Sequence, residues 1–196
     1  YDRSDRASLS FDTATAILDD FYGFCRQMHV DGHVTFTGGN PLLYPRFIDL
    51  YKAASSLGFG IAILGNPTPI DQIERVCEVA MPSYFQISLE GLAEYNDYIR
   101  GPGHFQRSLT FLDQLRQLSI YTMVMLTLSR DNMDQVLPLG RLLKDRVDTF
   151  NFNRLSTVGE GTRLAMPSKK DFERFLRAYV AESGQNPILG LKDNLI

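Results

Sequence analysis

The chain has 196 residues, of which 44% are hydrophobic and 22% charged, and a formal net charge of −3. This balance is typical of a single globular domain and excludes a mainly disordered chain. The small net charge and the scattered Lys and Arg residues argue against nucleic acid as a direct partner. No apolar run approaches the roughly 20 residues that cross a bilayer, and the N-terminus is too polar for a signal peptide, so we expect no membrane partner and a cytoplasmic location.

Helix and strand patterns alternate from the beginning of the chain. Apolar residues recur every three or four positions over 14–28, which predicts a helix with Ser10 as its N-cap. The expected buried stripe of this helix consists of Ala14, Ile17, Leu18, Phe21, Cys25 and Met28. The β-branched and aromatic segment 33–37 predicts a strand, which ends in the sequence Gly38-Gly39-Asn40-Pro41.

The same alternation continues to the end of the chain. Apolar periodicity predicts helices over 47–57, 70–80, 105–115 and 133–143. Gly58 closes the first of these helices, and Pro138 bends the last or marks its first turn. Strands are predicted over 59–64, 84–89, 121–128 and 149–155. A final helix is expected to begin at Ser168, which forms a capping box with Asp171.

Strands such as 61–64 and 123–126 are apolar on consecutive positions, as expected when both faces of a sheet are covered. Together with the alternation, this predicts an α/β fold, either a parallel barrel or a doubly wound sheet. No linker composition interrupts the pattern, so we expect one core domain over 1–183. The tail 184–196 contains Asn186-Pro187 and Gly190 and is predicted to begin a linker to a further domain.

The residues that most often hold metals or form Schiff bases give little signal. Cys25 and Cys77 each lie in a predicted helix, far apart, and are interpreted as small buried apolar side chains. The three His residues lack metal-like spacing, which disfavours a zinc hydrolase. No Lys stands at a predicted strand end, which disfavours a Schiff-base lyase or aldolase. The metal-ligand prediction for this chain is therefore none.

In a parallel α/β architecture ligands bind where the strands end. Gly38 and Gly39 can bring bare main chain against a ligand there, although a tight turn alone would also explain them. The segment matches neither the dinucleotide nor the P-loop glycine pattern.

Three motifs in order carry a family resemblance. The stretch from His33 to Pro45, with Gly38-Gly39-Asn40-Pro41 inside it, resembles the Gly-Gly-Glu-Pro segment after the second barrel strand of radical S-adenosylmethionine enzymes. Ser88-Leu89-Glu90-Gly91 resembles that family's Ser-Leu-Asp-Gly segment, and Tyr98-Ile99-Arg100-Gly101 resembles the Ile-Arg-Gly that follows it. The resemblance covers nearly the whole chain. Within the family it is nearest to peptide maturases with a C-terminal cysteine-rich domain of the SPASM type, including those for thio- or selenooxazole modification.

The resemblance implies a partial parallel (β/α) barrel and a set of cofactor-binding residues. Gly38, Gly39 and Asn40, followed by Pro41, would accept hydrogen bonds from the methionyl amine of S-adenosylmethionine, with Asn40 replacing the family's Glu. Ser88 would contact the ribose or the carboxylate, Arg100 would neutralise the carboxylate, and Glu90 stands where Asp is usual. Asn132, Val158 and Gly159 resemble later contacts to ribose and adenine. From the residues alone, Arg100 could equally cap a helix or pair with Glu90 or Glu94.

The implied cofactors are S-adenosylmethionine and a [4Fe-4S] cluster held by a Cys-x-x-x-Cys-x-x-Cys loop. Neither that loop nor the first barrel strand is in this chain, and Tyr1 would stand just after the loop, so we expect a piece of a longer protein that is inactive alone. The implied reaction is reductive cleavage of S-adenosylmethionine to a 5'-deoxyadenosyl radical, which takes hydrogen from a peptide or small-molecule substrate. An electron donor such as flavodoxin or ferredoxin is the implied partner. The open alternative is a non-catalytic barrel that binds a metabolite or peptide without a cluster.

Overall fold

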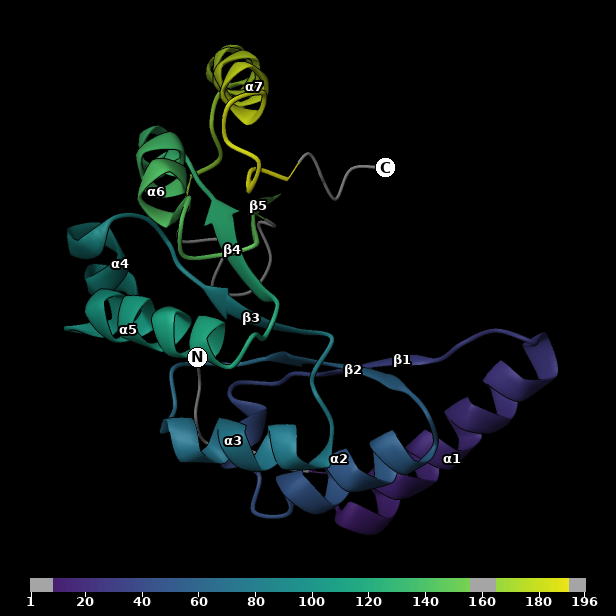
Figure 1. The fold of residues 1–196 in the computed structure, drawn as a ribbon. Helices are drawn as coiled ribbons and strands as arrows, with labels where there is room; N and C mark the ends of the chain where they lie inside the picture. The colour runs from purple at the N-terminus through teal and green to yellow at the C-terminus, as the bar shows by residue number, and fades with distance from the viewer. Residues whose placement is uncertain (1–8, 156–164, 191–196) are drawn as a thin grey trace. The chain divides into compact units, whose positions relative to one another are not determined.

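The computed structural model describes residues 9–155 and 165–190 of the chain. Five strands form one parallel sheet in the order β1-β2-β3-β4-β5, with helices in the connections (Figure 1). The order never reverses, as it would in a doubly wound sheet, so the predicted α/β fold is confirmed in its partial-barrel form. The expected place of Tyr1 lies outside the described residues. The chain divides into two compact units, residues 1–86 with 118–121 and residues 87–117 with 122–196, which are described in turn.

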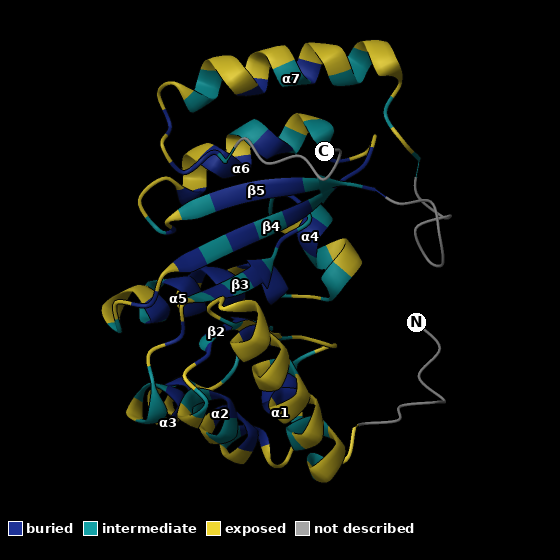
Figure 2. Cartoon of the chain, turned by 90° about the vertical axis from the view of Figure 1, so that its right-hand side faces the viewer, coloured by how far each residue is buried: buried dark blue, intermediate teal, exposed yellow. Residues whose placement is uncertain are grey.

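The first unit begins with helix α1 (Phe11–Met28). The Ser10 side chain caps it by accepting a hydrogen bond from the Thr13 N–H at 3.0 Å, as predicted. The expected buried stripe is only partly correct, because Leu18 and Cys25 are buried while Ile17 and Met28 are 51% and 55% exposed. Figure 2 shows α1 exposed along much of its length, which explains why a stripe as wide as the predicted one does not fit.

The strands of this unit are β1 (His33–Phe36), β2 (Gly60–Leu64) and the beginning of β3 (Tyr84–Ser88). They pair in parallel, with His33 opposite Gly60 and Ala62 opposite Tyr84. The His33 ring stacks on that of Tyr84 with 6.0 Å between the centroids, which agrees with a structural role for this histidine.

Helices α2 (Phe47–Ser56) and α3 (Ile70–Val79) form the connections of this unit, together with the short 3-10 helix η1 (Pro41–Leu43). Helices α1, α2 and α3 lie on the same side of β1 and β2 (Figure 1). Gly58, at φ 79°, follows the end of α2 as the glycine signal predicted.

The second unit holds the end of β3, β4 (Thr122–Leu128) and β5 (Thr149–Arg154). Alternate residues of β4 are buried, a pattern that Figure 2 shows along the strand. The connecting helices are α4 (Ala93–Arg100), α5 (His104–Gln117), η2 (Met133–Gln135) and α6 (Val136–Leu143). Pro138 lies in the first turn of α6, as expected. None of the helices within 9–155 and 165–190 is long and apolar enough to cross a membrane.

Helix α7 (Lys169–Ser183) starts at the predicted cap, where the Ser168 Oγ accepts from the Asp171 N–H at 3.1 Å. After α7 the chain returns to β5, and Phe150 and Leu189 form a parallel bridge. The described part of the predicted linker, as far as Gly190, thus packs on the sheet edge. The domain boundary at 183 stays a prediction.

Hydrogen bonds from Tyr179 hold this returning segment. Its hydroxyl is buried and lies 2.9 Å from the Gly190 carbonyl and 3.3 Å from the Phe150 carbonyl. Tyr179→Phe should lower the free energy of unfolding by about 1 to 2 kcal/mol, because the change removes the hydrogen bond from a buried hydroxyl to the Gly190 carbonyl. Urea unfolding measures this, with Tyr98→Phe as the control, since Tyr98 is 82% exposed. Equal losses in the two variants would contradict the assignment.

Candidate functional site

The glycine segment after β1 forms an exposed turn in the first unit. Gly38 and Gly39 have φ of 102° and 72°, and a Cβ at either position would meet no atom within 4 Å. Asn40 accepts a hydrogen bond from the Leu42 N–H at 3.4 Å and so caps η1, which starts at the buried Pro41. The turn therefore needs both glycines for its conformation and also leaves their main chain open to a ligand.

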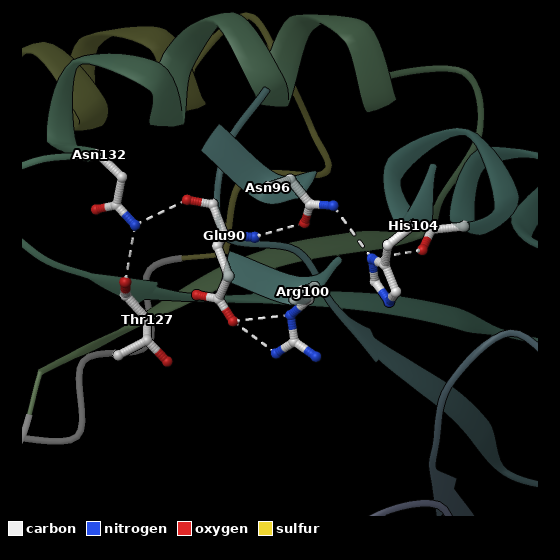
Figure 3. Close-up of polar contacts among 7 residues, drawn as sticks. Glu90, Asn96, Arg100, His104, Thr127 and Asn132 are labelled. Atoms are coloured by element: carbon white, nitrogen blue, oxygen red, sulfur yellow. Dashed lines mark hydrogen bonds and ion pairs between the residues drawn. The ribbon is translucent and has the colours of Figure 1, made fainter. Parts of the chain in front are cut away.

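Glu90 and Arg100 form an ion pair in the second unit (Figure 3). The Arg100 Nε and Nη2 donate to the same carboxylate oxygen of Glu90, at 3.0 and 2.5 Å. The Arg100 side chain is 26% exposed and the Glu90 side chain 13%, so water screens this ion pair less than it would screen a pair on the surface. Of the alternatives left open by the sequence, pairing of Arg100 with Glu90 is confirmed. A contact of Arg100 with a ligand carboxylate stays a prediction.

Three carboxamide side chains hold the segment that carries Glu90. The Asn96 Oδ1 accepts from the Glu90 N–H at 3.1 Å, and the Gln135 Oε1 accepts from the Leu92 N–H at 2.9 Å. The Asn132 Nδ2 donates to the Glu90 carbonyl at 2.8 Å and to the Thr127 carbonyl at 3.0 Å (Figure 3). Asn132 is buried and its hydrogen bonds go to the main chain, which favours a positioning role over the predicted contact with a ligand.

The sequence reasoning missed Asn96, Gln135 and His104. None belongs to a recognisable spacing, and the polar beginning of α4 gave no apolar periodicity from which to predict a buried side chain. Asn96 is fully buried, as is Ser108, one turn after His104 on α5. A buried polar side chain in a short polar helix can be found only once its hydrogen-bond partners are known.

His104 is a buried titratable group beside the ion pair. Its Nδ1 lies 3.1 Å from the Asn96 Nδ2. Because that Asn96 nitrogen is a donor, Nδ1 accepts and the proton of the neutral ring lies on Nε2. Burial lowers the pKa of His104 below its usual 6.5, and the positive charges of Arg100 and Arg107 lower it further, while Asp97 acts in the opposite direction.

This shift predicts a pH dependence of stability. Since the pKa of His104 is lower in the folded state, the unfolded chain binds more protons in weak acid, and stability should fall as pH drops below about 6.5. His104→Gln should lose less stability than the wild type between about pH 7 and 5.5. The pKa values of Asp97 and Glu182 are also lowered, but from 3.8 and 4.5, so those groups act at more acidic pH. Urea unfolding at the two pH values tests this, and parallel losses in both proteins would refute it.

Of the remaining predicted site residues, the structure describes Ser88 but not Val158 or Gly159. Ser88 is the half-buried last residue of β3. Val158 and Gly159 lie outside the described residues. No group of three or more His, Cys, Asp or Glu within 9–155 and 165–190 could hold a metal ion, with Cys25 buried in α1 and Cys77 half-buried in α3. The described residues therefore do not fit an iron-sulfur cluster.

Comparisons with known proteins agree with the motifs. The profile of the Radical SAM superfamily matches residues 18–143. Fe-coproporphyrin III synthase of Methanosarcina barkeri is 27% identical over 160 residues, which are 80% of this chain and 39% of that protein. Mycofactocin maturase MftC of Mycobacterium tuberculosis is 30% identical over 134 residues, which are 66% of this chain and 34% of MftC.

Among solved structures, SuiB of Streptococcus suis bound to S-adenosylmethionine has a TM-score of 0.73 at 18% identity. The match covers 98% of this chain and 45% of SuiB, and the structure of SuiB bound to precursor peptide SuiA gives a TM-score of 0.68. This likeness shows the fold. The chain spans less than half the length of each of these proteins. Since the superfamily profile matches more than half of the chain, the chain belongs to the Radical SAM superfamily, whose cofactors are S-adenosylmethionine and a [4Fe-4S] cluster.

Proposed function

We propose that this chain is the S-adenosylmethionine-binding core of an enzyme that cleaves S-adenosylmethionine reductively to a 5'-deoxyadenosyl radical and modifies a peptide. The observation that carries the proposal is the Glu90–Arg100 pair after β3, inside the segment that matches the superfamily. Its geometry is suited to a ligand with a carboxylate, because the pair holds a guanidinium in place before the ligand arrives. The cluster itself would supply the electron for the cleavage and would take its ligands from sequence beyond the described residues.

The residues of this chain would bind and orient the amino acid end of S-adenosylmethionine. The open main chain of Gly38 and Gly39 would accept from the amine, together with the Asn40 side chain. Arg100 would bind the carboxylate, and Ser88 would contact the ribose or the carboxylate. Asn40 in place of Glu removes a negative charge near the amine, and a neutral hydrogen bond is weaker than a charged one by about 1 kcal/mol.

A peptide is the substrate class that we favour. MftC is named a maturase, and a solved structure of SuiB contains a precursor peptide. Fe-coproporphyrin III synthase is a relative named for a porphyrin product, so porphyrin formation is the competing activity. We also propose that the full-length protein has a C-terminal cysteine-rich domain, receives electrons from a flavodoxin or ferredoxin, and is located in the cytoplasm.

The test uses the full-length protein, reconstituted with iron and sulfide without oxygen and reduced with dithionite. Stoichiometric iron and release of 5'-deoxyadenosine, followed by chromatography, are the expected results. A precursor peptide from the same gene neighbourhood should raise the release, whereas a tetrapyrrole precursor of Fe-coproporphyrin III should not. A protein that binds no iron and releases nothing would refute the radical enzyme and favour a non-catalytic barrel.

A further inference from the structure

Two buried carboxamide side chains bind the two backbone polar groups of Glu90, one its N–H and the other its carbonyl (Figure 3). Asn96 accepts from the Glu90 N–H, and Asn132 donates to the Glu90 carbonyl. Both side chains are almost completely buried, with exposures of 0% and 1%. The resemblance to the family gives Asn96 no role and gives Asn132 a ligand contact, whereas the hydrogen bonds of both side chains go to protein atoms. An unpaired carboxamide would be costly at such depth.

Each carboxamide connects Glu90 to a different element. The Asn96 Nδ2 donates to the His104 Nδ1 of α5 and to the Asp97 Oδ1 at 3.2 Å. The Asn132 side chain reaches the end of β4, where its Oδ1 accepts from the Ser129 N–H at 2.8 Å. Glu90 is therefore hydrogen-bonded through its N–H to a helix that follows β3 and through its carbonyl to a side chain that also contacts the end of β4.

Asn96 also lies on the helix that carries Arg100, one turn earlier at a spacing of four residues. Side chains four residues apart share a face of a helix. The same helix thus fixes the Glu90 main chain through Asn96 and pairs with the Glu90 carboxylate through Arg100. A displacement of the Glu90 main chain would turn its carboxylate away from the guanidinium.

We propose that Asn96 and Asn132 are positioning residues, which hold Glu90 so that Arg100 is aimed at the carboxylate of S-adenosylmethionine. The inference rests on the proposed function of this site. It deepens that function, because it states that recognition of the carboxylate depends on two side chains that do not touch the ligand. Asn96 and Asn132 together form what we call the clamp. Substitution of a clamp residue should weaken the contact with the carboxylate of S-adenosylmethionine and leave the contacts with the rest of the ligand unchanged.

The test measures dissociation constants by anaerobic calorimetry on the reconstituted full-length protein. Asn96→Ala should weaken binding of S-adenosylmethionine by about five- to tenfold, the size of one lost hydrogen bond. Binding of decarboxylated S-adenosylmethionine, which offers Arg100 no carboxylate, should change less than about twofold. In an Arg100→Gln background the Asn96 change should add almost nothing, because the two substitutions act on one contact.

Asn186→Ala is the matched control. Asn186 is a buried carboxamide of the same unit, and its Nδ2 donates to the Gly140 carbonyl at 3.0 Å, away from the Glu90 segment. This variant should lose stability and keep wild-type binding of both ligands. Asn132→Ala carries the same expectation as Asn96→Ala, and it decides the matter if Asn96→Ala does not fold.

The outcomes separate the inference from the proposed function. A wild-type protein that binds neither ligand would refute the proposed function. A wild type that binds S-adenosylmethionine, with clamp variants that bind it equally well or lose both ligands to the same degree, would overturn the positioning role alone. Failure of both clamp variants to fold, when Asn186→Ala folds, would also overturn it, because the two carboxamides would then serve the fold.

Discussion

Arg100→Gln is expected to weaken binding of S-adenosylmethionine by about 10- to 100-fold in the reconstituted full-length protein, as measured by calorimetry. A hydrogen bond to a charged group contributes about 1.5 to 3 kcal/mol, which gives this range. The substitution also leaves the Glu90 carboxylate, which is 13% exposed, without its cation. A ligand carboxylate would then meet an unpaired negative charge, so the loss has an attractive and a repulsive part.

The chain offers a matched control for this substitution. Arg141 pairs with Glu182 through its Nε and Nη2, at 2.8 and 2.7 Å, and its side chain is 60% exposed. Arg141→Gln removes the same charge and should leave binding unchanged, because an exposed ion pair contributes little.

The double variant Glu90→Gln with Arg100→Gln distinguishes two roles of Arg100. It should remain weak if Arg100 binds the ligand. Recovery of wild-type binding in the double variant would show that Arg100 serves only to neutralise Glu90, and would refute the contact.

The sequence was sufficient for the α/β alternation and for the elements whose signals are local. Ser10 and Ser168 cap their helices as predicted, because a cap depends on residues within one turn. The consecutive apolar residues of β2 and the glycine after α2 are likewise read directly from the chain. The order of the strands was not determined by these signals, because the residues alone allowed both a parallel barrel and a doubly wound sheet.

What the sequence did not reveal depends on distant partners. Helix α4 was not predicted as a separate helix, because Glu94, Asn96 and Asp97 make it polar although it has a buried residue. The Asp97 carboxylate helps to hold α4 against α5. It accepts hydrogen bonds from the Gly103 and Phe105 N–H groups at 2.6 and 2.7 Å and thereby caps α5. The prediction that Ile17 in α1 is buried was wrong. Periodicity shows which residues share a face of a helix, but it does not show how much of that face is covered by the rest of the protein.

Gly38→Val is expected to weaken binding of S-adenosylmethionine by more than about tenfold with only a modest loss of stability. The strain of a side chain at a φ of 102° costs about 1 to 3 kcal/mol, and the space around the Cβ is open, so no packed neighbour has to move. A branched side chain would instead occupy the space in front of the main chain that is proposed to receive the amine. Calorimetry measures the binding, and urea unfolding measures the stability.

Gly58→Val separates strain from lost access. Gly58 also has a positive φ, 79°, and a Cβ there would likewise meet nothing within 4 Å, but it ends α2 and has no proposed ligand contact. Both variants should lose similar stability, because the backbone strain is of the same kind. Only Gly38→Val should lose binding, and a Gly58→Val protein that loses it equally would mean that strain in this unit, not access to the glycine main chain, governs the affinity.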